Sequence, residues 1–361
     1  MQAFCCILLN SAHTNAKTQE GDYLSIHKRG RQSFCLPQPP VIRAWASVAG
    51  KKESEGPLAS YFDYSSTDTH FGEATWEQGE KRMQQIALET LAVKAGLELS
   101  DLDVVLSGDL LNQCIGSSFP LRNTGIPHLG LYGACSTMAQ SLLLAAMTVG
   151  GGYADRVAAM TSSHFAGSER QYRFPLGYGG QRTPTAQWTV TGSGAALVTT
   201  EPGPIAIESA TIGTVRDLGI TDANNMGAAM APAAFDTIRT HLEDTKTTPK
   251  DYDLIVTGDL GTVGLEALVQ LFREAGIQAG GKLTDCGNLI FDAGRQDVHA
   301  GGSGCGCSAI VLCSELLNKL QSGKLKKILF CGTGALLSPT STQQKLPIPG
   351  VCHAVCIESR R

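Results

Sequence analysis

Blocks of apolar and polar residues alternate along the chain and predict strands and helices in turn. Residues 41–49, "VIRAWASVA", form an apolar run typical of a buried strand, and the charged residues 50–58 that follow predict a loop. Residues 74–95 carry apolar side chains at helical spacing and end at Gly96, which predicts an amphipathic helix. The chain is therefore expected to mix helices and strands.

The second half of the chain repeats the pattern of the first. Residues 251–261, "DYDLIVTGDLG", copy the order of residues 101–111, "DLDVVLSGDLL": an acid, an apolar run, then Gly-Asp-Leu. Residues 304–337 likewise parallel residues 133–164, since each segment runs from Cys-Ser through a helix and a Gly-containing turn to an apolar strand. Two copies of one strand–loop–helix–strand unit predict a duplicated α/β fold.

The first residues stand outside this repeat. Residues 1–28 contain the short apolar stretch "AFCCILL" with no Lys or Arg before it, which does not fit a secretory signal or a membrane anchor. We interpret them as a disordered extension or as the product of a mis-set start codon, and we do not expect a secreted protein. Residues 29–202 and 203–361 are then the two halves.

A long stretch of the first half carries no charge. Between Arg122 and Asp155 the chain has no charged side chain, and "SLLLAAMTVGGGYA" is strongly apolar. A transmembrane helix and a helix buried on all sides are both conceivable. Pro127, the polar "ACST" and the "GGG" interrupt the stretch before it reaches about 20 continuous apolar residues. We therefore favour a buried helix.

Composition narrows the possible functions. Hydrophobic residues make up 42% and charged residues 17% of the chain, and the net charge is −4, so nothing indicates a nucleic-acid-binding surface. The twelve cysteines lack the framework of a small disulfide-rich domain, which predicts reduced thiols. Cys305 and Cys307 form a C-x-C without a second pair at zinc-site spacing. No resident metal or cofactor is expected.

Polar residues follow the apolar strands in both halves. In open α/β sheets the carboxyl ends of the strands gather around one ligand site. The loops "SGDLLN", "TSSH", "TGDLG" and "GTGALLSP" lie at such ends, and Cys135 and the segment 303–305 enter from the two halves. The candidate ligand-binding residues from these segments are Asp109, Cys135, Ser162, Ser163, His164, Asp259, Ser303 and Cys305.

Three of these residues leave two interpretations open. Cys135, in "LYGACST", is either an activated thiolate at a helix N-terminus or a packed thiol. Asp109 and Asp259 occupy equivalent places in the repeats. They either accept backbone N–H bonds in their turns or face the pocket, where they could bind Ca²⁺ with a ligand.

The motifs are similar to those of a known family. A duplicated chain with a cysteine at the head of a buried helix resembles the thiolase superfamily. Within it, "GACSTMAQ", "TSSHFAGSERQYRFPLGYGGQ", "DLGITDANNMGAAMAPAAFDTI" and "HAGGSGCGCSA" resemble the stage V sporulation protein AD family, over roughly residues 30–358. The resemblance implies an α-β-α-β-α fold in which two pseudo-symmetric halves hold mixed five-stranded sheets around buried helices.

The resemblance also implies a function in sporulation. It implies a non-catalytic protein that binds dipicolinic acid (pyridine-2,6-dicarboxylate), with or without Ca²⁺. Such a protein supports uptake of this acid into the developing spore, together with integral-membrane partner proteins. We expect it to be soluble or peripherally associated with the spore inner membrane, and to form a homodimer as thiolase-like proteins generally do.

The catalytic pattern of the superfamily is incomplete. Where condensing enzymes carry a His, the chain has Asp259, and where they carry an Asn or a second His it has Ser303 and Cys305. None of these side chains replaces an imidazole base near neutral pH. The alternative function, an enzyme that processes acyl thioesters through Cys135, would have to use His164 as its base.

A basic and aromatic segment could complete the site. Residues 168–184 carry arginines and aromatic rings, which suit a carboxylate and a pyridine ring respectively. Because two carboxylates would repel a bare dicarboxylate, Arg170, Arg173, a cation or helix N–H groups would have to compensate. The same segment could instead form a dimer surface. His299 is a further, weaker candidate.

Overall fold

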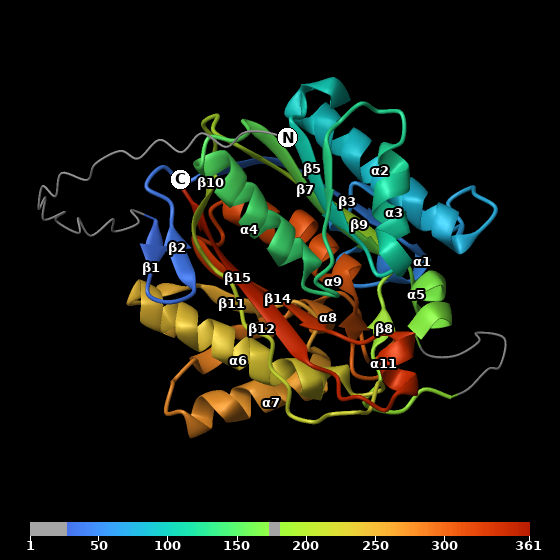
Figure 1. The fold of residues 1–361 in the computed structure, drawn as a ribbon, viewed down its shortest axis with the longest axis vertical. Coiled ribbons are helices and arrows are strands. Elements are labelled where there is room, and N and C mark those ends of the chain that lie inside the picture. Colours follow the sequence, from blue (N-terminus) through green and yellow to red (C-terminus); the bar gives the residue numbers. More distant parts are fainter. Residues whose placement is uncertain (1–26, 173–180) are drawn as a thin grey trace, which may run out of the picture.

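In the computed structural model, residues 27–172 and 181–361 are described. Most of the segment 1–28 and Arg173 lie outside these ranges. Ten strands of the described residues form a continuous path, β12-β11-β14-β15-β10-β3-β9-β7-β5-β6, in which each half of the chain contributes five neighbouring strands. The two sets of five meet at one antiparallel pairing, Val41 with Ala206. Figure 1 shows the two sheets with helices between and outside them.

The two sheets have the same pairing pattern. In the first, β5 pairs in parallel with β6 and β7, and β9 pairs antiparallel with β7 and β3. In the second, β11 pairs in parallel with β12 and β14, and β15 pairs antiparallel with β14 and β10. The first-sheet strands are β3 (Val41–Ala49), β5 (Val104–Gly108), β6 (His128–Gly130), β7 (Arg156–Ser163) and β9 (Gly192–Thr199). Those of the second are β10 (Ile205–Thr211), β11 (Leu254–Thr257), β12 (Leu283–Asp285), β14 (Lys327–Ala335) and β15 (Gly350–Ser359).

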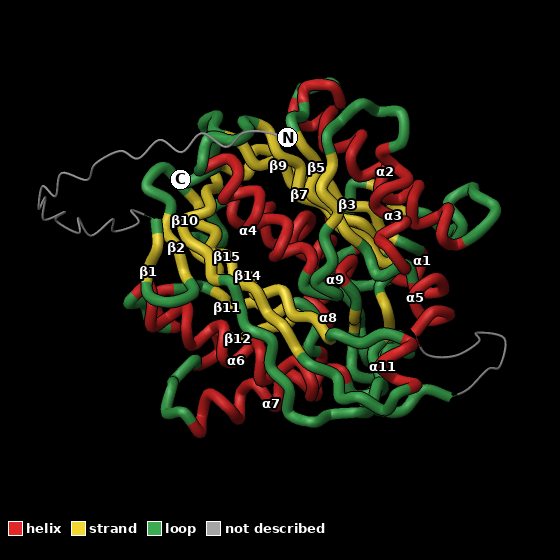
Figure 2. Tube along the Cα trace, viewed as in Figure 1, coloured by secondary structure: helices red, strands yellow, loops and turns green. Residues whose placement is uncertain are grey.

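The helices form three layers around these sheets, as the tube in Figure 2 shows. Helix α2 packs on the outer face of the first sheet and α6 on that of the second, while α4 contacts strands of both sheets and packs beside α9. The longer helices are α2 (Trp76–Ala95), α4 (Thr137–Gly150), α5 (Phe165–Tyr172), α6 (Met226–Thr245), α7 (Gly261–Glu274) and α9 (Cys305–Val311), and the short α10 (Leu317–Gln321) follows α9. The predicted duplicated α-β-α-β-α class is confirmed.

Shorter elements complete the described chain. The remaining strands are β1 (Lys28–Arg29), β2 (Ser33–Cys35), β4 (Tyr64–Ser65), β8 (Trp188–Thr189) and β13 (Gly302–Ser303). The remaining α-helices are α1 (Lys51–Ser54), α3 (Ile115–Ser118), α8 (Cys286–Leu289) and α11 (Pro339–Gln343). Helix α1 corrects the prediction of a loop over 50–58, because a single short turn leaves no apolar periodicity to detect.

The uncharged stretch forms α4, which lies in the central layer as expected. Its residues Met138, Leu142 and Ala145 are fully buried between the sheets. None of the helices in the described ranges has both the length and the apolar character needed to cross a membrane. The cysteines of the described ranges are all free thiols, and most of them are buried. The predicted reduced state is thus retained there.

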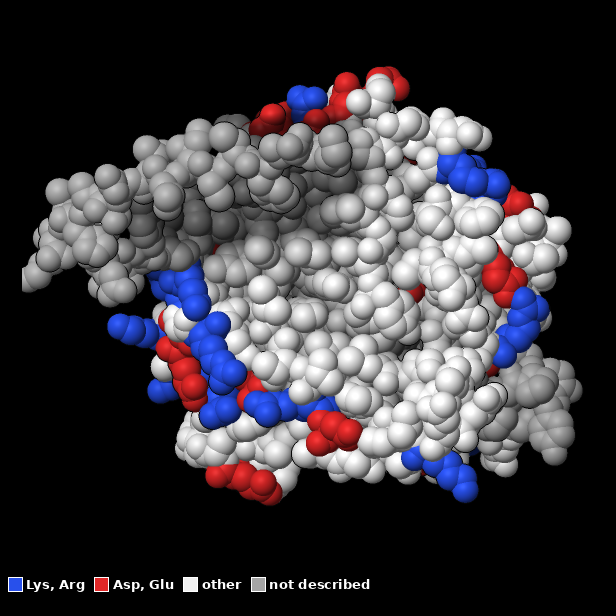
Figure 3. All heavy atoms as spheres, viewed as in Figure 1, with Lys and Arg blue, Asp and Glu red and all other residues white. Residues whose placement is uncertain are grey.

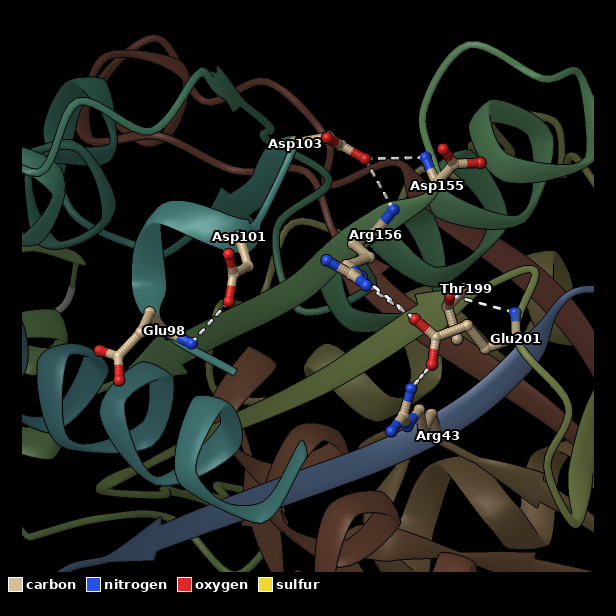
Figure 4. Close-up of polar contacts among 8 residues, drawn as sticks. All are labelled: Arg43, Glu98, Asp101, Asp103, Asp155, Arg156, Thr199 and Glu201. Carbon is tan, nitrogen blue, oxygen red and sulfur yellow. Dashed lines mark hydrogen bonds and ion pairs between the residues drawn. The ribbon is translucent and has the colours of Figure 1, made fainter. Parts of the chain in front are cut away.

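Matching polar contacts hold corresponding pairs of strands together in the two repeats. The Asp103 carboxylate accepts hydrogen bonds from the amides of Asp155 and Arg156 at 2.8 and 2.9 Å, which joins the start of β5 to the start of β7 (Figure 4). Asp253 does the same for β11 and β14 through the amides of residues 326–327. The acid directly before the apolar run of each repeated motif, Asp103 or Asp253, therefore joins two neighbouring strands.

A second contact ties the edge of the first sheet together. Glu201 follows β9, and its carboxylate pairs with both Arg43 of β3 and Arg156 of β7 (Figure 4). The amide of Glu201 donates to the Thr199 hydroxyl, which holds the turn. One carboxylate thus links three neighbouring strands on the side opposite the carboxyl end of β7.

Candidate functional site

Cys135 lies in a tight turn at the head of α4. Ala134, directly before it, has a positive φ of 49°, a left-handed conformation that is uncommon for residues other than glycine. The Ser136 hydroxyl donates to the Gly133 carbonyl at 2.6 Å, and the Thr137 hydroxyl donates to the Ala134 carbonyl at 2.6 Å. The small and hydroxyl residues of "GACST" therefore build the turn that presents the thiol.

The second half brings a matching turn to the same place. Gly304 has φ 96° directly before Cys305, a conformation that favours glycine. The Cys305 thiol donates to the Ser162 carbonyl at 2.9 Å. Cys135, Cys305 and Leu110 form one small buried cluster. The expectation that the two repeats meet at Cys135 is thus reproduced in the structure.

A narrow pocket, here called the Cys135 pocket, opens beside this cluster. Its volume is about 40 Å³, room for a few water molecules. Of the candidate residues, Cys135 and Ser303 line it. The other lining residues are Leu110, Tyr132, Ala134, Ser168, Glu169, Tyr172, Thr189, Met226, Ala335 and Leu337.

Asp259 lies behind the pocket wall and holds it together. Its buried carboxylate accepts hydrogen bonds from the Gly304 amide at 2.9 Å, the Thr333 hydroxyl at 2.8 Å and the Ser303 hydroxyl at 3.3 Å. It also interacts electrostatically with the Cys135 thiol. Burial raises the pKa of Asp259 to about 6. The Asp259 carboxylate thus joins β14, through Thr333, to the segment Ser303–Gly304.

The Cys135 thiol is held in its neutral form. Burial, followed by repulsion from Asp259 and Cys305, raises the pKa of Cys135 well above its ordinary value. Because the thiolate is the nucleophilic form, burial works against activation of this cysteine by the dipole of α4.

We expect Cys135 to resist alkylation. Iodoacetamide should label the partly exposed Cys35 faster than Cys135 at neutral pH, and the labelling rate of Cys135 should show no inflection below about pH 9. Mass spectrometry of timed samples measures both sites, and denatured protein, in which every cysteine reacts, is the control. Rapid, selective labelling of Cys135 at neutral pH would instead favour the acyl-thioester enzyme.

His164 and Ser163 face away from this pocket. The His164 Nε2 bonds to the Thr69 carbonyl at 2.7 Å, its Nδ1 lies 3.5 Å from the Gly167 amide, and burial lowers its pKa. Ser163 donates to the Val190 carbonyl at 2.7 Å. His164 does not line the Cys135 pocket, so the geometry offers no support for its use as a base toward Cys135.

Asp109 and Ser162 belong to a buried polar network. The Ser117 hydroxyl and amide donate to Asp109 at 2.6 and 2.7 Å. Gln84 donates to the hydroxyls of both Ser117 and Ser162, and Ser162 donates to Glu80 at 2.8 Å. Asp109 therefore has the turn-capping environment of its first interpretation, although it follows a strand just as Asp259 does.

Glu80 and Gln84 were missed by sequence reasoning. Both lie on the buried face of α2 that also carries Met83. The sequence did contain a signal for Glu80. It lies three residues before Met83, and so its carboxylate falls on the apolar face of the predicted helix. The Glu80 Oε2 and Gln84 Oε1 atoms have no hydrogen-bond partner within the described residues.

The Glu80–Asp109 pair makes stability depend on pH. Burial raises the pKa of Asp109 to about 6, and burial and repulsion from Asp109 raise that of Glu80 well above its ordinary value. The contribution of these two carboxyl groups to the free energy of unfolding is fully present below about pH 4. It is lost as the pH rises through their raised pKa values.

We expect Glu80→Gln to remove much of this loss. At pH 8 the variant should be more stable than the wild type by about 1–3 kcal/mol, with little difference near pH 4. Urea unfolding across this pH range measures it. Glu89→Gln, an exposed change on the same helix, should stay within about 0.5 kcal/mol. Equal pH dependence in wild type and Glu80→Gln would contradict the assignment.

The basic candidates do not reach the Cys135 pocket in the described structure. The Arg170 guanidinium pairs with Glu77 and lies 5.4 Å from the Trp76 ring centroid. Arg173 lies outside the described residues. His299 bonds to a backbone carbonyl at 2.6 Å and is not a pocket residue. Their proposed contacts with a ligand stay predictions.

The pocket's polar lining comes mostly from α5 and β8. Glu169 accepts a hydrogen bond from the Thr189 hydroxyl at 2.9 Å. The Tyr172 hydroxyl donates to the Leu110 carbonyl at 2.6 Å and lies 3.1 Å from the Tyr132 hydroxyl. The segment 168–184 was singled out for its arginines, but its described contribution to the pocket is a carboxylate, a hydroxyl and a phenol.

The electrostatics of the site follow from this lining. Among the lining residues that the structure describes there is no Lys, Arg or His, whereas Glu169 faces the pocket and Asp259 lies behind it. No group of three or more His, Cys, Asp or Glu side chains in residues 27–172 and 181–361 is arranged to hold a metal ion. Glu169 is itself engaged, because it accepts the Thr189 hydroxyl and has a further interaction besides.

The chain is similar to proteins of one sporulation family. Residues 30–358 match the family model of stage V sporulation protein AD. The chain is 46% identical, over 329 residues, to stage V sporulation protein AD of Bacillus subtilis (strain 168), covering 91% of this chain and 97% of that protein.

Solved structures share the fold. The 3-oxoacyl-[acyl-carrier-protein] synthase III of Aquifex aeolicus VF5 matches with a TM-score of 0.54 at 15% identity, over 88% of this chain and 99% of that one. The synthase III of Pseudomonas aeruginosa PAO1 matches with a TM-score of 0.52 at 14% identity, over 90% and 99%. The fold is thus that of the thiolase-like condensing enzymes, and by sequence the chain belongs to the stage V sporulation protein AD family.

Proposed function

We propose that this protein binds dipicolinic acid in the Cys135 pocket without chemical conversion and supports its uptake into the developing spore. Membership of a sporulation family supports the biological setting. The observation that carries the proposal is the buried Cys135 thiol, which lies beside Ser303 in a pocket whose described lining residues include no histidine to act as its base. A retained pocket without an activated nucleophile favours binding over catalysis.

The calcium chelate is the form that the pocket's charge favours. Free dipicolinate carries two negative charges, and the buried Asp259 carboxylate behind the pocket wall would repel it. A Ca²⁺ ion held by the two carboxylates and the ring nitrogen neutralises the ligand and keeps open coordination positions. The Glu169 carboxylate can fill one of them, because Ca²⁺ takes 6–8 oxygen ligands.

Ligand entry requires the pocket to open. A cavity of about 150 Å³ is known to hold a benzene ring, whereas the Cys135 pocket has about 40 Å³. The Tyr172 ring, whose hydroxyl bonds to Leu110 and Tyr132, is the side chain best placed to swing away. We propose that its displacement admits the ligand.

Calorimetry tests the proposed function. Purified protein is titrated with dipicolinate in the presence of Ca²⁺ and, separately, of a calcium chelator. Saturable heat with Ca²⁺, and much weaker heat without it, is expected. No saturable binding under either condition would overturn the proposal, and turnover of an acyl thioester would point to the enzyme instead.

Partner proteins form the second part of the proposal. We propose that the loaded protein delivers dipicolinate to integral-membrane partners at the spore inner membrane, and that it acts as a homodimer. The edge strand β6 is the proposed contact with the second copy of the chain. Among the described strands it pairs only with β5, and Leu129 on it is 60% exposed. Figure 3 shows uncharged residues over the middle of the face on which α4 lies.

We expect Leu129→Arg to shift the protein from dimer to monomer. An arginine on a paired edge strand would place charges face to face in a symmetric interface. Analytical ultracentrifugation measures the mass, and Val93→Arg, at an exposed position on α2, is the control. A monomeric wild type, or a variant that remains dimeric, would contradict the proposed interface.

A further inference from the structure

A groove lies between the β1–β2 hairpin and the last turn of α4, at the edge of the molecule that β1 and β2 form in Figure 1. This hairpin groove has a volume of about 340 Å³, within the range of about 300–1,000 Å³ that small-molecule sites occupy. Its apolar walls come from Phe34 and Leu36 at β2, Met147 of α4 and Ile212 directly after β10. It shares no lining residue with the Cys135 pocket.

Asp244 of α6 anchors the hairpin that forms one wall of this groove. Its carboxylate accepts hydrogen bonds from the amides of residues 31–33 at 3.1 to 3.3 Å and from the Ser33 hydroxyl at 2.8 Å. Gly30 turns the hairpin with a φ of 54°, and a Cβ atom there would overlap the Asp244 carboxylate. The hairpin is therefore held in place by contacts beneath its turn, and the carboxylate oxygens of Asp244 are used in those contacts.

The groove carries basic side chains without a lining acid. His27, Lys28 and Arg31 line it, and no Asp or Glu is among its described lining residues. The Arg31 side chain is exposed and forms no ion pair within the described part of the chain, whereas Lys28 and Arg29 have further interactions. Asp244 offsets one of these charges, and the hairpin keeps a net positive charge. Figure 3 shows Lys and Arg side chains at this edge. The rim of the groove thus favours an anionic group.

Exposed apolar side chains surround the same groove. Met147 and Ile212, which line it, are 42% and 45% exposed. Tyr153, in the turn after α4, is 86% exposed, and its ring lies beside Gly151 of the groove, because a Cβ atom at Gly151 would be 2.8 Å from Tyr153 Cε2. Exposed apolar surface rimmed by polar residues is typical of protein or membrane contact sites, and Tyr is enriched where proteins meet lipid headgroups.

We propose that the hairpin groove binds an anionic phospholipid at a membrane surface. The acyl chain lies along the apolar walls, and the phosphate lies beside Lys28 and Arg31. Tyr153 then stands at the level of the headgroups. A small anion would leave the apolar walls uncovered. A second copy of the chain is disfavoured, because a symmetric contact would bring two cationic hairpins face to face.

This inference does not depend on what the Cys135 pocket binds. The proposed function assigns membrane contact to integral-membrane proteins. The hairpin groove adds direct contact with lipid, which vesicles without any protein can measure.

Vesicle flotation tests the cationic rim. At about 0.1 M salt, vesicles of phosphatidylglycerol mixed with phosphatidylcholine should bind the protein at least tenfold more tightly than vesicles of phosphatidylcholine alone. The double variant Lys28→Gln, Arg31→Gln should weaken binding to the anionic vesicles at least tenfold. Lys51→Gln, Arg273→Gln removes the same charge at exposed positions of α1 and α7, away from the hairpin in Figure 1, and should change binding less than threefold.

Tyr153→Ser tests the apolar part of the surface. It should weaken binding to the anionic vesicles about three- to tenfold, because it removes an aromatic ring from the level of the headgroups. Val93→Ser, at a position of α2 that is 79% exposed, is the matched control and should bind as the wild type does.

Several results would overturn the inference: equal binding to the two kinds of vesicle, equal binding by the double variant and its control, or unchanged binding by Tyr153→Ser. Binding of dispersed laurate without binding of vesicles would assign the groove to a free fatty acid, and loss of the dimer in the double variant would assign it to a second copy. If the double variant is unstable, Arg31→Gln alone carries the test. All variants should bind calcium dipicolinate as the wild type does, so failure of the Cys135 pocket to bind the chelate would leave the vesicle result standing.

Discussion

Gly108→Ala is expected to destabilise the fold by about 3 kcal/mol. A Cβ atom at Gly108 would overlap the Leu131 carbonyl oxygen and lie 2.8 Å from Thr137 Cγ2. Gly108 ends β5 where the segment that leads to Cys135 crosses it, and that backbone has no free direction in which to move. Urea unfolding of wild type and variant at one pH measures the loss.

The matched control is Gly281→Ala. Its Cβ would meet nothing within 4 Å, and its φ of −82° suits any residue, so we expect a change within about 0.5 kcal/mol. If Gly108→Ala were as stable as this control, the close approach of β5 to the Cys135 turn would be incorrect, and so would the geometry of the pocket.

Glu169→Gln is expected to weaken the binding of calcium dipicolinate by about 10–100-fold. The change keeps the shape of the side chain and an acceptor for Thr189, but it removes the one carboxylate that lines the described pocket. A charged contact of this kind is worth about 1.5–3 kcal/mol, which corresponds to this range of affinity. Calorimetric titration of both proteins gives the ratio.

Glu266→Gln is the control for charge alone, because Glu266 is exposed on α7. It should bind the chelate as the wild type does. Unchanged affinity of Glu169→Gln for the chelate would show that Ca²⁺ is not held at Glu169. Because the variant loses a negative charge, we also expect it to bind free dipicolinate more tightly than the wild type does.

The fold could be predicted from the sequence because its signals are local and repeated. The two copies of acid–apolar run–Gly-Asp-Leu form β5 and β11, and the acids directly before the apolar runs, Asp103 and Asp253, accept hydrogen bonds from equivalent amides. Helix α2 ends at Gly96, whose φ is 68° and whose amide bonds to carbonyls of the last helical turn. This end can be predicted because it depends only on neighbouring residues.

The different contacts made by equivalent residues of the two repeats could not be predicted from the sequence. Asp109 and Asp259 stand at the same place in the repeats, yet Asp109 joins Ser117 and faces Glu80 of α2, whereas Asp259 joins the turn before Cys305. These environments depend on which distant segment packs against each strand end. His164 shows the same limit, since its partner is the carbonyl of Thr69, 95 residues away.

The fold of the condensing enzymes here holds a buried thiol in a small pocket. The duplicated sheets bring Cys135, Ser303 and Asp259 together. Burial, followed by repulsion from Asp259, raises the pKa of Cys135 well above its ordinary value. A small pocket of this kind, built on rigid elements, suits the binding role that we propose.

The most direct test of this account is a crystal structure of the protein grown with calcium dipicolinate. The account predicts ligand density beside Cys135 and Ser303, with the Ca²⁺ ion in contact with Glu169 and the Tyr172 ring displaced. Density confined to another surface, or a covalent adduct on Cys135, would contradict it.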